Sequence, residues 1–505
     1  MKDSTESGGA AKSRAGIVSS EDIPLRGASF AASLADPATW NSPTRDHSAR
    51  SSQSPGQSFR LGRGSRVAVV GGGPAGSLFS HFLLRTLSLS GTSVELDIFE
   101  PRLFTHSGPS GCNHCGGIVS ESLVQLLATE GINLPPEVVQ RGIDSYQMHM
   151  DVGQVRISTP LQEKRIAAVY RGNGPRHAPP RMSTGFDGYL LDMAVRGGAN
   201  WRRQLVNRLQ RQGGKWQIGC AEGAGGSYDL LVVACGINSA LLPILAETGI
   251  GYQPPTRLRT FIAEFHLGRA VIEAILGTSM HVFLLDIPGL QFAALIPKGD
   301  YVTLCMLGDN VDDGMINAFL NSPEVRECFP EGRVPGNVCH CLAGINVRRA
   351  KQLYGDGFVF IGDSAVARLY KDGIGSAYRT AKAAATTCAL QGISCADLRD
   401  GYHPACRALL RDNRIGEFIF AVCHLIQKLR FTRRAVLRMV EHEQSIPDRV
   451  PRMSSVLWDV FSGSAPYSSV LARTLHPAFL GSLLWNLVVA NLPGAESSTR
   501  GVRAT

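Results

Sequence analysis

The sequence has few of the features that mark membrane-spanning, secreted or nucleic-acid-binding proteins. It has no run of about 18 or more uncharged apolar residues, and its nearest candidate for a spanning helix, residues 479–492, is too short. Its 12 cysteines are sparse for 505 residues, and no apolar segment near the N-terminus predicts a secretory signal. Only 7% of residues are aromatic, without a basic stretch studded with them, so no nucleic-acid partner is predicted. We therefore expect a cytoplasmic protein.

Hydrophobic residues, by contrast, make up 44% of the chain against 18% charged residues, which suffices for a large buried core. A formal net charge of +9 suits an anionic cofactor or an anionic membrane surface as partner. Residues 1–60 are rich in Ser, Gly, Ala and Pro and show no apolar period, so we predict a disordered tail there.

The order of helical and strand patterns predicts an α/β fold with two interleaved parts. A strand at 66–70, a helix at 78–87 and a strand at 94–100 form a βαβ unit, and a helix at 186–195 and a buried strand at 230–234 continue it. Alternating apolar and polar residues predict antiparallel strands at 146–157, 165–170, 258–267, 281–285, 291–296 and 301–306. We therefore expect a Rossmann-type dinucleotide-binding domain, interleaved with an antiparallel β-sheet substrate domain and followed by a C-terminal helical region.

This alternation sets the expected domain boundaries. The dinucleotide-binding domain is predicted to comprise residues 61–140, 183–254 and 347–395. The substrate domain is predicted to comprise residues 141–182 and 255–346, and the helical region residues 396–505.

A glycine motif lies between the first predicted strand and helix. Gly71, Gly73 and Gly76 form GxGxxG, with Ala75 before the last glycine. In such a turn the glycines permit a tight bend, close approach to a pyrophosphate and close packing of the helix on the sheet. Glu100 ends the next predicted strand 24 residues after Gly76, where a carboxylate can bind ribose hydroxyls.

A second glycine motif follows another buried strand, some 290 residues later. That strand ends in Gly362-Asp363, and Gly373 and Gly375 precede an Ala-rich helix. An aspartate here can hold a polyol chain, and the two later glycines let the backbone approach a flat ring. We expect the start of the helix to direct its positive end at that ring.

Together these motifs resemble the FAD-binding motifs of glutathione-reductase-type flavoproteins. Cys115-Gly116-Gly117 is similar to the CGG motif of geranylgeranyl reductases. The segment from Arg181 to Leu191, with Phe186-Asp187 and Leu190, is similar to the Arg, Phe-Asp, Leu stretch of the same family. The likeness covers residues 66–390. It implies FAD as cofactor, with the CGG residues facing the isoalloxazine and with Arg181, Asp363 and Gly375 contacting the cofactor. Aromatic hydroxylases of this superfamily carry Asp-Gly after the strand corresponding to 230–234, and here that aspartate is missing.

Cys115 and His114 are the candidate catalytic residues. A thiol beside the ring can tune the cofactor or donate a proton, and the reference pKa of histidine suits a proton donor. Cys112 and Cys115 also have CxxC spacing, which leaves a redox dithiol open. A zinc site would need a second ligand pair, and the only clustered residues, Cys339, His340 and Cys341, have unsuitable spacing, so no metal is predicted.

The C-terminal region has a basic amphipathic pattern. Its cations among apolar residues are Lys428, Arg430, Arg433, Arg434 and Arg438. Such a segment either lies on an anionic membrane, with residues 479–492 in the interface nearby, or packs on the fold with a solvated basic face. Both interpretations stay open, and the first would place the protein on the inner face of the membrane.

The family resemblance predicts an FAD-dependent oxidoreductase. The CGG motif, the missing hydroxylase aspartate and the basic C-terminus favour hydride transfer from reduced FAD to a carbon–carbon double bond of an apolar isoprenoid or lipid substrate. The electron donor stays open between NAD(P)H, a ferredoxin and a quinol. The alternatives are an FAD monooxygenase or dehydrogenase of another apolar small molecule, and a non-catalytic flavin-binding, membrane-associated protein.

Overall fold

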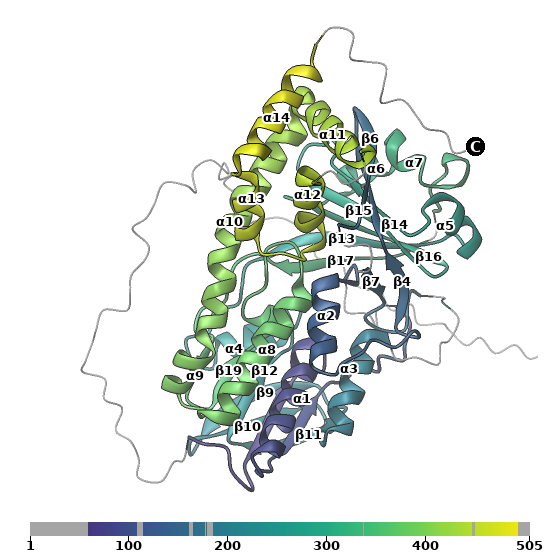
Figure 1. Cartoon of the computed structure of the whole chain (residues 1–505). Helices are drawn as coiled ribbons and strands as arrows, with labels where there is room; N and C mark the ends of the chain where they lie inside the picture. Colours follow the sequence, from purple (N-terminus) through teal and green to yellow (C-terminus); the bar gives the residue numbers. More distant parts are fainter. Residues whose placement is uncertain are drawn as a thin grey trace, which may run out of the picture. The chain divides into compact units, whose positions relative to one another are not determined.

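Buried, largely apolar strands form the parallel sheet that carries both glycine motifs. This sheet lies in the lower half of the molecule as drawn in Figure 1. The computed structural model describes residues 59–108, 115–160, 165–176, 178, 185–336, 338–446 and 450–492, all within one compact unit. The strands lie in the order β18 (Tyr354–Gly355), β19 (Phe358–Phe360), β12 (Leu230–Val233), β1 (Arg66–Val70), β2 (Glu95–Phe99) and β8 (Asn200–Arg202). All neighbours pair in parallel except β18 and β19.

Helices and a small sheet cover this parallel sheet. Helix α1 (Pro74–Leu89) packs against both α3 (Gly185–Arg196) and α8 (Gly373–Leu390). An antiparallel sheet of β9 (Val206–Gln212), β10 (Lys215–Cys220) and β11 (Gly223–Tyr228) contacts β1 and β12. Because both faces are covered, the central strands are apolar along nearly their whole length, as parallel strands usually are.

A second, seven-stranded sheet forms the other part of the fold. Its order is β17 (Cys339–Asn346), β13 (Arg257–His266), β16 (Tyr301–Gly308), β15 (Leu290–Lys298), β14 (Ser279–Phe283), β5 (Ser145–Met150) and β6 (Gly153–Ser158). The expectation of purely antiparallel pairing is wrong at one place, since β5 and β14 pair in parallel. Parallel neighbours need a long crossover, and the chain passes through the Rossmann-type part between these two strands. A three-stranded sheet of β3 (Ile118–Val119), β7 (Ile166–Val169) and β4 (Val139–Ile143) joins the two parts.

Short helices cover one face of the seven-stranded sheet, and the C-terminal helices pack on the other. The short helices are α5 (Arg269–Ile275), α6 (Asp313–Leu320) and α7 (Pro323–Arg326), followed by a 3-10 turn at Pro330–Gly332. The C-terminal helices that pack there are α10 (His403–Lys428), α11 (Arg430–Ser445), α12 (Arg452–Ser462), α13 (Tyr467–Thr474) and α14 (Pro477–Val489). Helix α9 (Cys395–Gly401) instead contacts α8 and β18 of the Rossmann-type part. Two further helices are α2 (Glu121–Thr129) and α4 (Leu241–Ala246). This confirms the predicted fold class, a Rossmann-type α/β part interleaved with a largely antiparallel sheet, plus a C-terminal helical region.

The basic C-terminal pattern differs from the expected single face. The helix axis breaks between Lys428 and Arg430, and Arg433 is buried and pairs with Asp151 at 2.8 Å. Arg433 therefore holds α11 against the β5–β6 hairpin and is not a solvated cation. Within the described ranges, none of the helices has both the length and the hydropathy needed to cross a bilayer.

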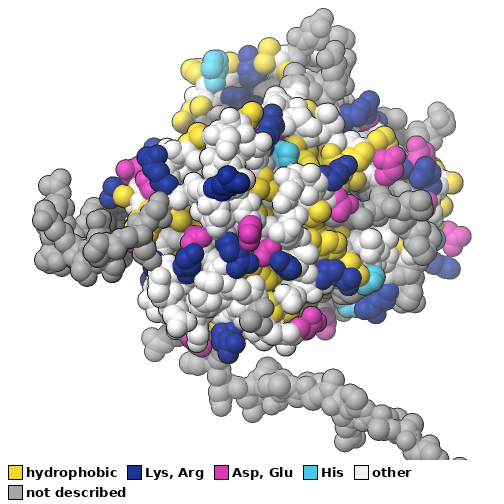
Figure 2. Space-filling model, turned by 90° about the horizontal axis from the view of Figure 1, so that it is seen from below, with side chains coloured by type: hydrophobic (Ala, Val, Ile, Leu, Met, Phe, Trp, Pro, Cys, Tyr) yellow, Lys and Arg dark blue, Asp and Glu magenta, His cyan; other side chains and the backbone are white. Residues whose placement is uncertain are grey.

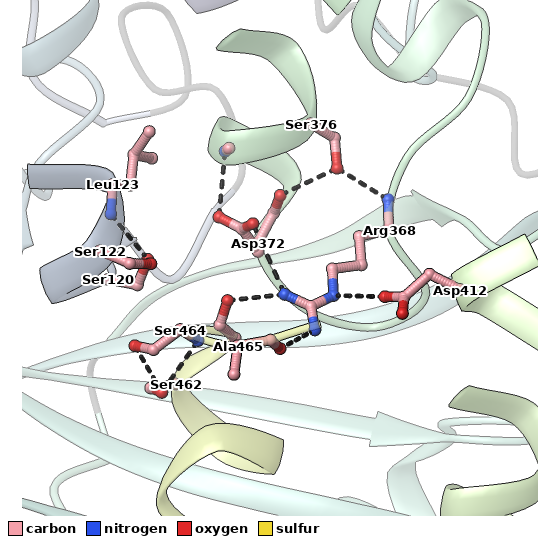
Figure 3. Close-up of polar contacts among 12 residues, drawn as sticks. Ser120, Ser122, Leu123, Arg368, Asp372, Ser376, Asp412, Ser462, Ser464 and Ala465 are labelled. Atoms are coloured by element: carbon pink, nitrogen blue, oxygen red, sulfur yellow. Dashed lines mark hydrogen bonds and ion pairs between the residues drawn. The ribbon is translucent and has the colours of Figure 1, made fainter. Parts of the chain in front are cut away.

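A buried arginine ties the second glycine motif to the C-terminal helices (Figure 3). The Arg368 guanidinium is 3% exposed, donates to the Gly463 and Ala465 carbonyls, and lies 3.5 Å from Asp412 and 3.8 Å from Asp372. Its main-chain N–H donates to Ser376 Oγ at 2.8 Å. Asp372 begins α8, so one cation fixes the segment that leads into this helix.

We expect Arg368→Met to lower the free energy of unfolding by about 3–5 kcal/mol, because it leaves buried carboxylates without their shared cation. Arg379 pairs with the same Asp372 at 2.8 Å but is 34% exposed. Arg379→Met is the matched control and should cost less than about 1 kcal/mol. Urea unfolding of both variants measures the difference, and equal losses would show that Arg368 has no special role.

Candidate functional site

The first glycine motif forms a turn that side chains could not fit. Gly71 has a φ of +109°, and a Cβ there would lie 2.4 Å from the Ala234 carbonyl oxygen. A Cβ on Gly76 would lie 1.9 Å from the Gly71 carbonyl oxygen. Helix α1 begins after Gly73 with Pro74, without a side-chain cap or an acidic residue in its first turn. Its N-terminus therefore presents backbone N–H groups and a partial positive charge, which suit a phosphate.

Glu100 lies against this turn. Its buried carboxylate accepts a hydrogen bond from the Gly72 main-chain N–H at 3.1 Å and another from the Arg102 N–H at 3.0 Å. The Arg102 side chain pairs with it at 3.1 Å. Glu100 thus stabilises the turn. It also lines the large cavity described below, and its position after β2 is the one expected for a ribose contact.

The second motif meets the first directly. Gly362 has a φ of +61°, and a Cβ on it would lie 2.8 Å from the Ala75 Cβ at the start of α1. Its N–H donates to Thr380 Oγ1 on α8 at 3.0 Å. The turn at Gly362–Ser364 therefore packs against the first motif, although almost 290 residues separate them.

One continuous cavity of about 680 Å³ runs between the two motifs and the seven-stranded sheet. Roughly 300–1,000 Å³ is usual for ligand sites. Among the predicted residues that the structure describes, those that line it are Gly71, Gly73, Ala75, Glu100, Cys115, Gly116, Gly117, Asp363 and Gly373. Gly76, Gly362 and Gly375 are not part of the lining and act through the backbone packing of the turns.

The start of α8 differs from the expectation. The helix N-terminus is capped by Asp372, whose carboxylate accepts the Gly375 N–H at 3.1 Å. A Cβ on Gly375 would lie 2.1 Å from that carboxylate, so this glycine makes room for the cap. Asp372 therefore adds a negative charge at this helix end, and Arg368 and Arg379 balance it.

The Cys115-Gly116-Gly117 loop forms the wall between the cavity and β15–β16. Gly117 has a φ of +67°, and a Cβ there would lie 1.9 Å from the Val169 carbonyl oxygen. A Cβ on Gly116 would lie 2.7 Å from the Cys305 sulfur. Backbone without side chains therefore faces the cavity at this point. Three predicted residues, Cys112, His114 and Arg181, lie outside the described residues.

An arginine that the sequence analysis missed lies beside Cys115. Arg171 follows β7, pairs with Asp187 of the Phe-Asp pair, and lines the cavity. Burial alone would lower its pKa, but Asp187 and the Cys115 thiol raise the pKa of Arg171 above its usual value. Burial raises the pKa of Asp363, and the Arg171 charge opposes that shift. The Asp187 partner was a signal available in the sequence, since it stands in the motif that led to Arg181.

A lysine is the second missed residue. Lys371 precedes Asp372, and its Nζ lies 3.8 Å from the ring centroid of Phe292 and 5.5 Å from that of Phe461. Burial lowers the pKa of this amine to about 7. Apolar side chains form the wall around it, namely Met280, Phe292, Ala294, Ile296, Leu307 and Phe461. Only the tertiary fold brings a lysine beside these strands, so no local pattern could have identified it.

Two further cysteines, Cys339 and Cys341, lie near Cys115. Cys339, His340 and Cys341 of β17 line a small cavity of about 40 Å³ together with Cys115. All three of these cysteines are free thiols. In the part of the chain that the structure describes, they form no group with metal-ligand geometry. The dithiol interpretation concerns Cys112, which is outside the described residues.

We expect Gly117→Ala to lower the free energy of unfolding by about 1–3 kcal/mol, because it forces a left-handed backbone on a side chain and a contact with main chain. Gly116→Ala should be destabilising as well, but its clash is with the Cys305 sulfur alone. A Cys305→Ala background should therefore relieve the Gly116→Ala penalty and leave the Gly117→Ala penalty unchanged. A double-mutant cycle by thermal unfolding measures this, and an equal penalty for Gly116→Ala in both backgrounds would contradict the described geometry.

No model of a known protein family matches the chain, and no curated protein matches it. Solved structures do. A flavoprotein/dehydrogenase from Cytophaga hutchinsonii superposes with a TM-score of 0.54 at 15% identity, over 79% of this chain and 93% of that chain. The halogenase PltM, in complex with phloroglucinol and FAD, superposes with a TM-score of 0.54 at 11% identity, over 86% and 99%. The flavin-dependent brominase Bmp2 gives a TM-score of 0.50 at 16% identity, over 84% and 93%.

At these identities the likeness is one of fold. The chain therefore has the fold of FAD-binding flavoproteins, which a dehydrogenase and flavin-dependent halogenases share.

Proposed function

We propose that the protein is an FAD-dependent oxidoreductase that reduces carbon–carbon double bonds of an apolar isoprenoid or lipid substrate. The observation that carries this proposal is the single cavity that begins at two converging glycine turns and ends among apolar side chains. The N-terminus of α1 and Glu100 suit the pyrophosphate and ribose of a dinucleotide. Asp363, with its position after β19, suits a polyol chain.

The apolar lining of part of the cavity supports the proposed substrate class. Phe292, Phe461 and other apolar side chains line the cavity, and Lys371, Cys115 and Cys305 are among its polar lining residues. Burial raises the pKa of Cys305 to about 12, so this thiol stays neutral. Such a lining favours a substrate that is largely hydrocarbon.

Reduction of a double bond needs a hydride on one carbon and a proton on the other. Reduced FAD, when bound, supplies the hydride. Lys371 is suited to donate the proton. An amine with a pKa of about 7 is half protonated at neutral pH, and its ammonium form loses the proton readily. The neutral amine that remains regains its proton from solvent. Lys371 thus joins Cys115 as a candidate donor, and the Gly116-Gly117 backbone leaves the reacting atoms unobstructed.

The test is an anaerobic single turnover. Protein loaded with FAD and reduced with dithionite is mixed with a prenyl lipid, and flavin reoxidation and a gain of two hydrogens in the lipid are measured from pH 6 to pH 9. If the Lys371 ammonium donates the proton, the rate is full below pH 7 and falls as the pH rises through 7. Lys371→Met and Lys371→Arg should lose about 10²-fold or more and should lack this pH dependence. Cys115→Ala should keep it.

The outcomes separate the alternatives. Flavin that stays reduced, with no mass gain in the lipid, would contradict lipid reduction. Oxygen consumption in air with one oxygen atom added to a product would select the monooxygenase. Lys371→Met with the rate and pH profile of the unchanged protein would exclude Lys371 as the donor.

A lipid substrate also requires contact with lipid, and we propose that α14 supplies it. Helix α14 contains no charged residue and directs its apolar side chains outward, with Leu484 63%, Trp485 67% and Val488 60% exposed. Its polar Asn486 is buried instead. On the neighbouring helix α10, Phe418, Val422 and Leu425 are exposed at helical spacing. An outward apolar face of this kind is typical of a helix that lies in a membrane interface.

Charge complementarity favours an anionic bilayer as the partner of the α14 surface. The Asn491 side chain donates to the Phe431 carbonyl at 3.3 Å, which places the end of α14 beside the start of α11. Exposed Lys428 and Arg430 lie at that junction. By contrast, the face seen in Figure 2, at the end of the molecule away from α14, has acidic and basic side chains interspersed. Lipids with negative headgroups fit the first surface better than the second.

We expect the full chain to float with phosphatidylglycerol vesicles and less with phosphatidylcholine vesicles. The double change Leu484→Glu and Trp485→Glu should reduce the bound fraction at least about tenfold, because two large apolar side chains lose their burial in lipid. Leu89→Glu is the matched control, since Leu89 is an isolated exposed apolar residue of α1. Equal flotation of both variants would contradict the proposal, as would self-association through α14 without vesicle binding.

A further inference from the structure

Two histidines and a cysteine converge inside the molecule, away from the candidate active site. His149 lies on β5, His281 on β14, and Cys328 just after α7. His149 Nε2 lies 3.0 Å from His281 Nδ1, and Cys328 Sγ lies 3.2 Å from the same nitrogen. All three donor atoms lie within 4.8 Å of one another, and all three side chains are buried.

The parallel pairing of β5 and β14 creates this cluster. Its register sets Phe283 opposite His149 and Gln147 opposite His281, so both histidines point to the same face of the sheet. That face packs on α5, α6 and α7 through an apolar cluster that includes Phe283 and Cys328. The alternate residues of β14, such as Met280, line the large cavity on the opposite face. The seven-stranded sheet therefore separates the cluster from the candidate active site.

Hydrogen bonding alone leaves this arrangement incomplete. A ring nitrogen of histidine has either one hydrogen or one lone pair in the ring plane. His281 Nδ1 has two partners at hydrogen-bonding distance, His149 and Cys328, and can serve only one of them well. The Cys328 thiol can instead donate to the Glu324 carbonyl at 3.6 Å, which leaves the 3.2 Å sulfur–nitrogen contact without a hydrogen. A positive ion between the three atoms would satisfy all of them at once.

The protonation states of the two histidines suit such an ion. Burial lowers the pKa of His149 to about 4, and burial together with His149 lowers the pKa of His281 as well. Both imidazoles are therefore neutral, the state in which histidine binds metal. Burial raises the pKa of the Cys328 thiol to about 12, so its proton is present until a metal displaces it.

We propose that His149, His281 and Cys328 form a structural binding site for a soft d10 metal ion, Cu(I) or Zn²⁺. Metal–nitrogen bonds of about 2.0–2.1 Å and metal–sulfur bonds of about 2.3 Å place donors roughly 3.3–3.7 Å apart. The observed 3.0 and 3.2 Å thus need to widen by a few tenths of an ångström. Binding forms a metal–sulfur bond and two metal–nitrogen bonds, and it releases the Cys328 proton to solvent.

Charge favours Cu(I) of the two ions. A Cu(I) ion with one thiolate and two neutral imidazoles has no net charge, whereas Zn²⁺ leaves one positive charge. Among the described residues, no carboxylate joins the three donors. A net charge in an apolar layer is costly without such a partner. Trigonal coordination by two histidines and one cysteine is also an arrangement that copper accepts.

The test is the metal content of the full chain after expression in medium supplemented with copper or with zinc, because a buried site is best filled during folding. We expect one more metal ion per chain in the unchanged protein than in Cys328→Ala or His281→Ala. Cys388→Ala is the matched control, since Cys388 is another buried free thiol and belongs to no group of three possible metal ligands among the described residues. It should keep the full metal content.

Stability supplies a second readout that does not depend on the variants folding. Protein loaded with Cu(I) or Zn²⁺ should unfold at a higher temperature than the same protein after chelation, because metal binds the native site. The proposal would be overturned if Cys328→Ala contained as much metal per chain as the unchanged protein. It would also be overturned if chelation left the unfolding temperature unchanged. Neither measurement involves flavin turnover, so failure here is distinct from failure of the proposed function.

Discussion

The structure depends on the close approach of three backbone segments at positions where no side chain would fit. The turn after β1, the end of β12 and the turn after β19 meet because Gly71, Gly76 and Gly362 lack a Cβ. A side chain at any of these positions would lie within 2.8 Å of a neighbouring atom. Because these glycines lack side chains, the strands and helices pack closely, and main-chain N–H groups face the cavity. Fold and candidate site therefore follow from one steric constraint.

Two buried charged side chains, Glu100 and Arg368, hold the segments next to these glycine turns in place. Glu100 binds the first turn through the Gly72 N–H, and Arg368 holds the segment before α8 against α10 and the α12–α13 turn. Both side chains are almost fully buried, so their interactions are strong and are weakly screened by salt. These contacts frame Lys371, whose amine lies beside the Phe292 ring and whose pKa is lowered to about 7 by burial. Rigid positioning of a titratable group with a pKa near 7 is what acid–base chemistry requires.

Local sequence was enough to predict the fold class, because its signals are local. The glycine turns, the buried runs of β1 and β12 and the alternating strands of the larger sheet each appear within a few residues. The parallel β5–β14 pair, the Asp372 cap and the burial of Arg433 were not predicted, since each depends on residues distant in the chain. The same reason separates the site residues. Gly73, Glu100 and Asp363 stand in motifs, whereas Lys371 becomes notable only when the fold brings Phe292 and Phe461 to it.

If two distant turns bind the two halves of one dinucleotide, the protein should distinguish FAD from FMN. Comparison of FAD with FMN in an equilibrium binding titration tests it most directly, because FMN lacks the adenosine half that the α1 N-terminus and Glu100 are expected to contact. We expect FAD to bind more tightly on the order of a hundredfold, because FMN cannot make the hydrogen bonds to charged groups at the adenosine half. Equal affinity for the two flavins, or no binding of either, would contradict it.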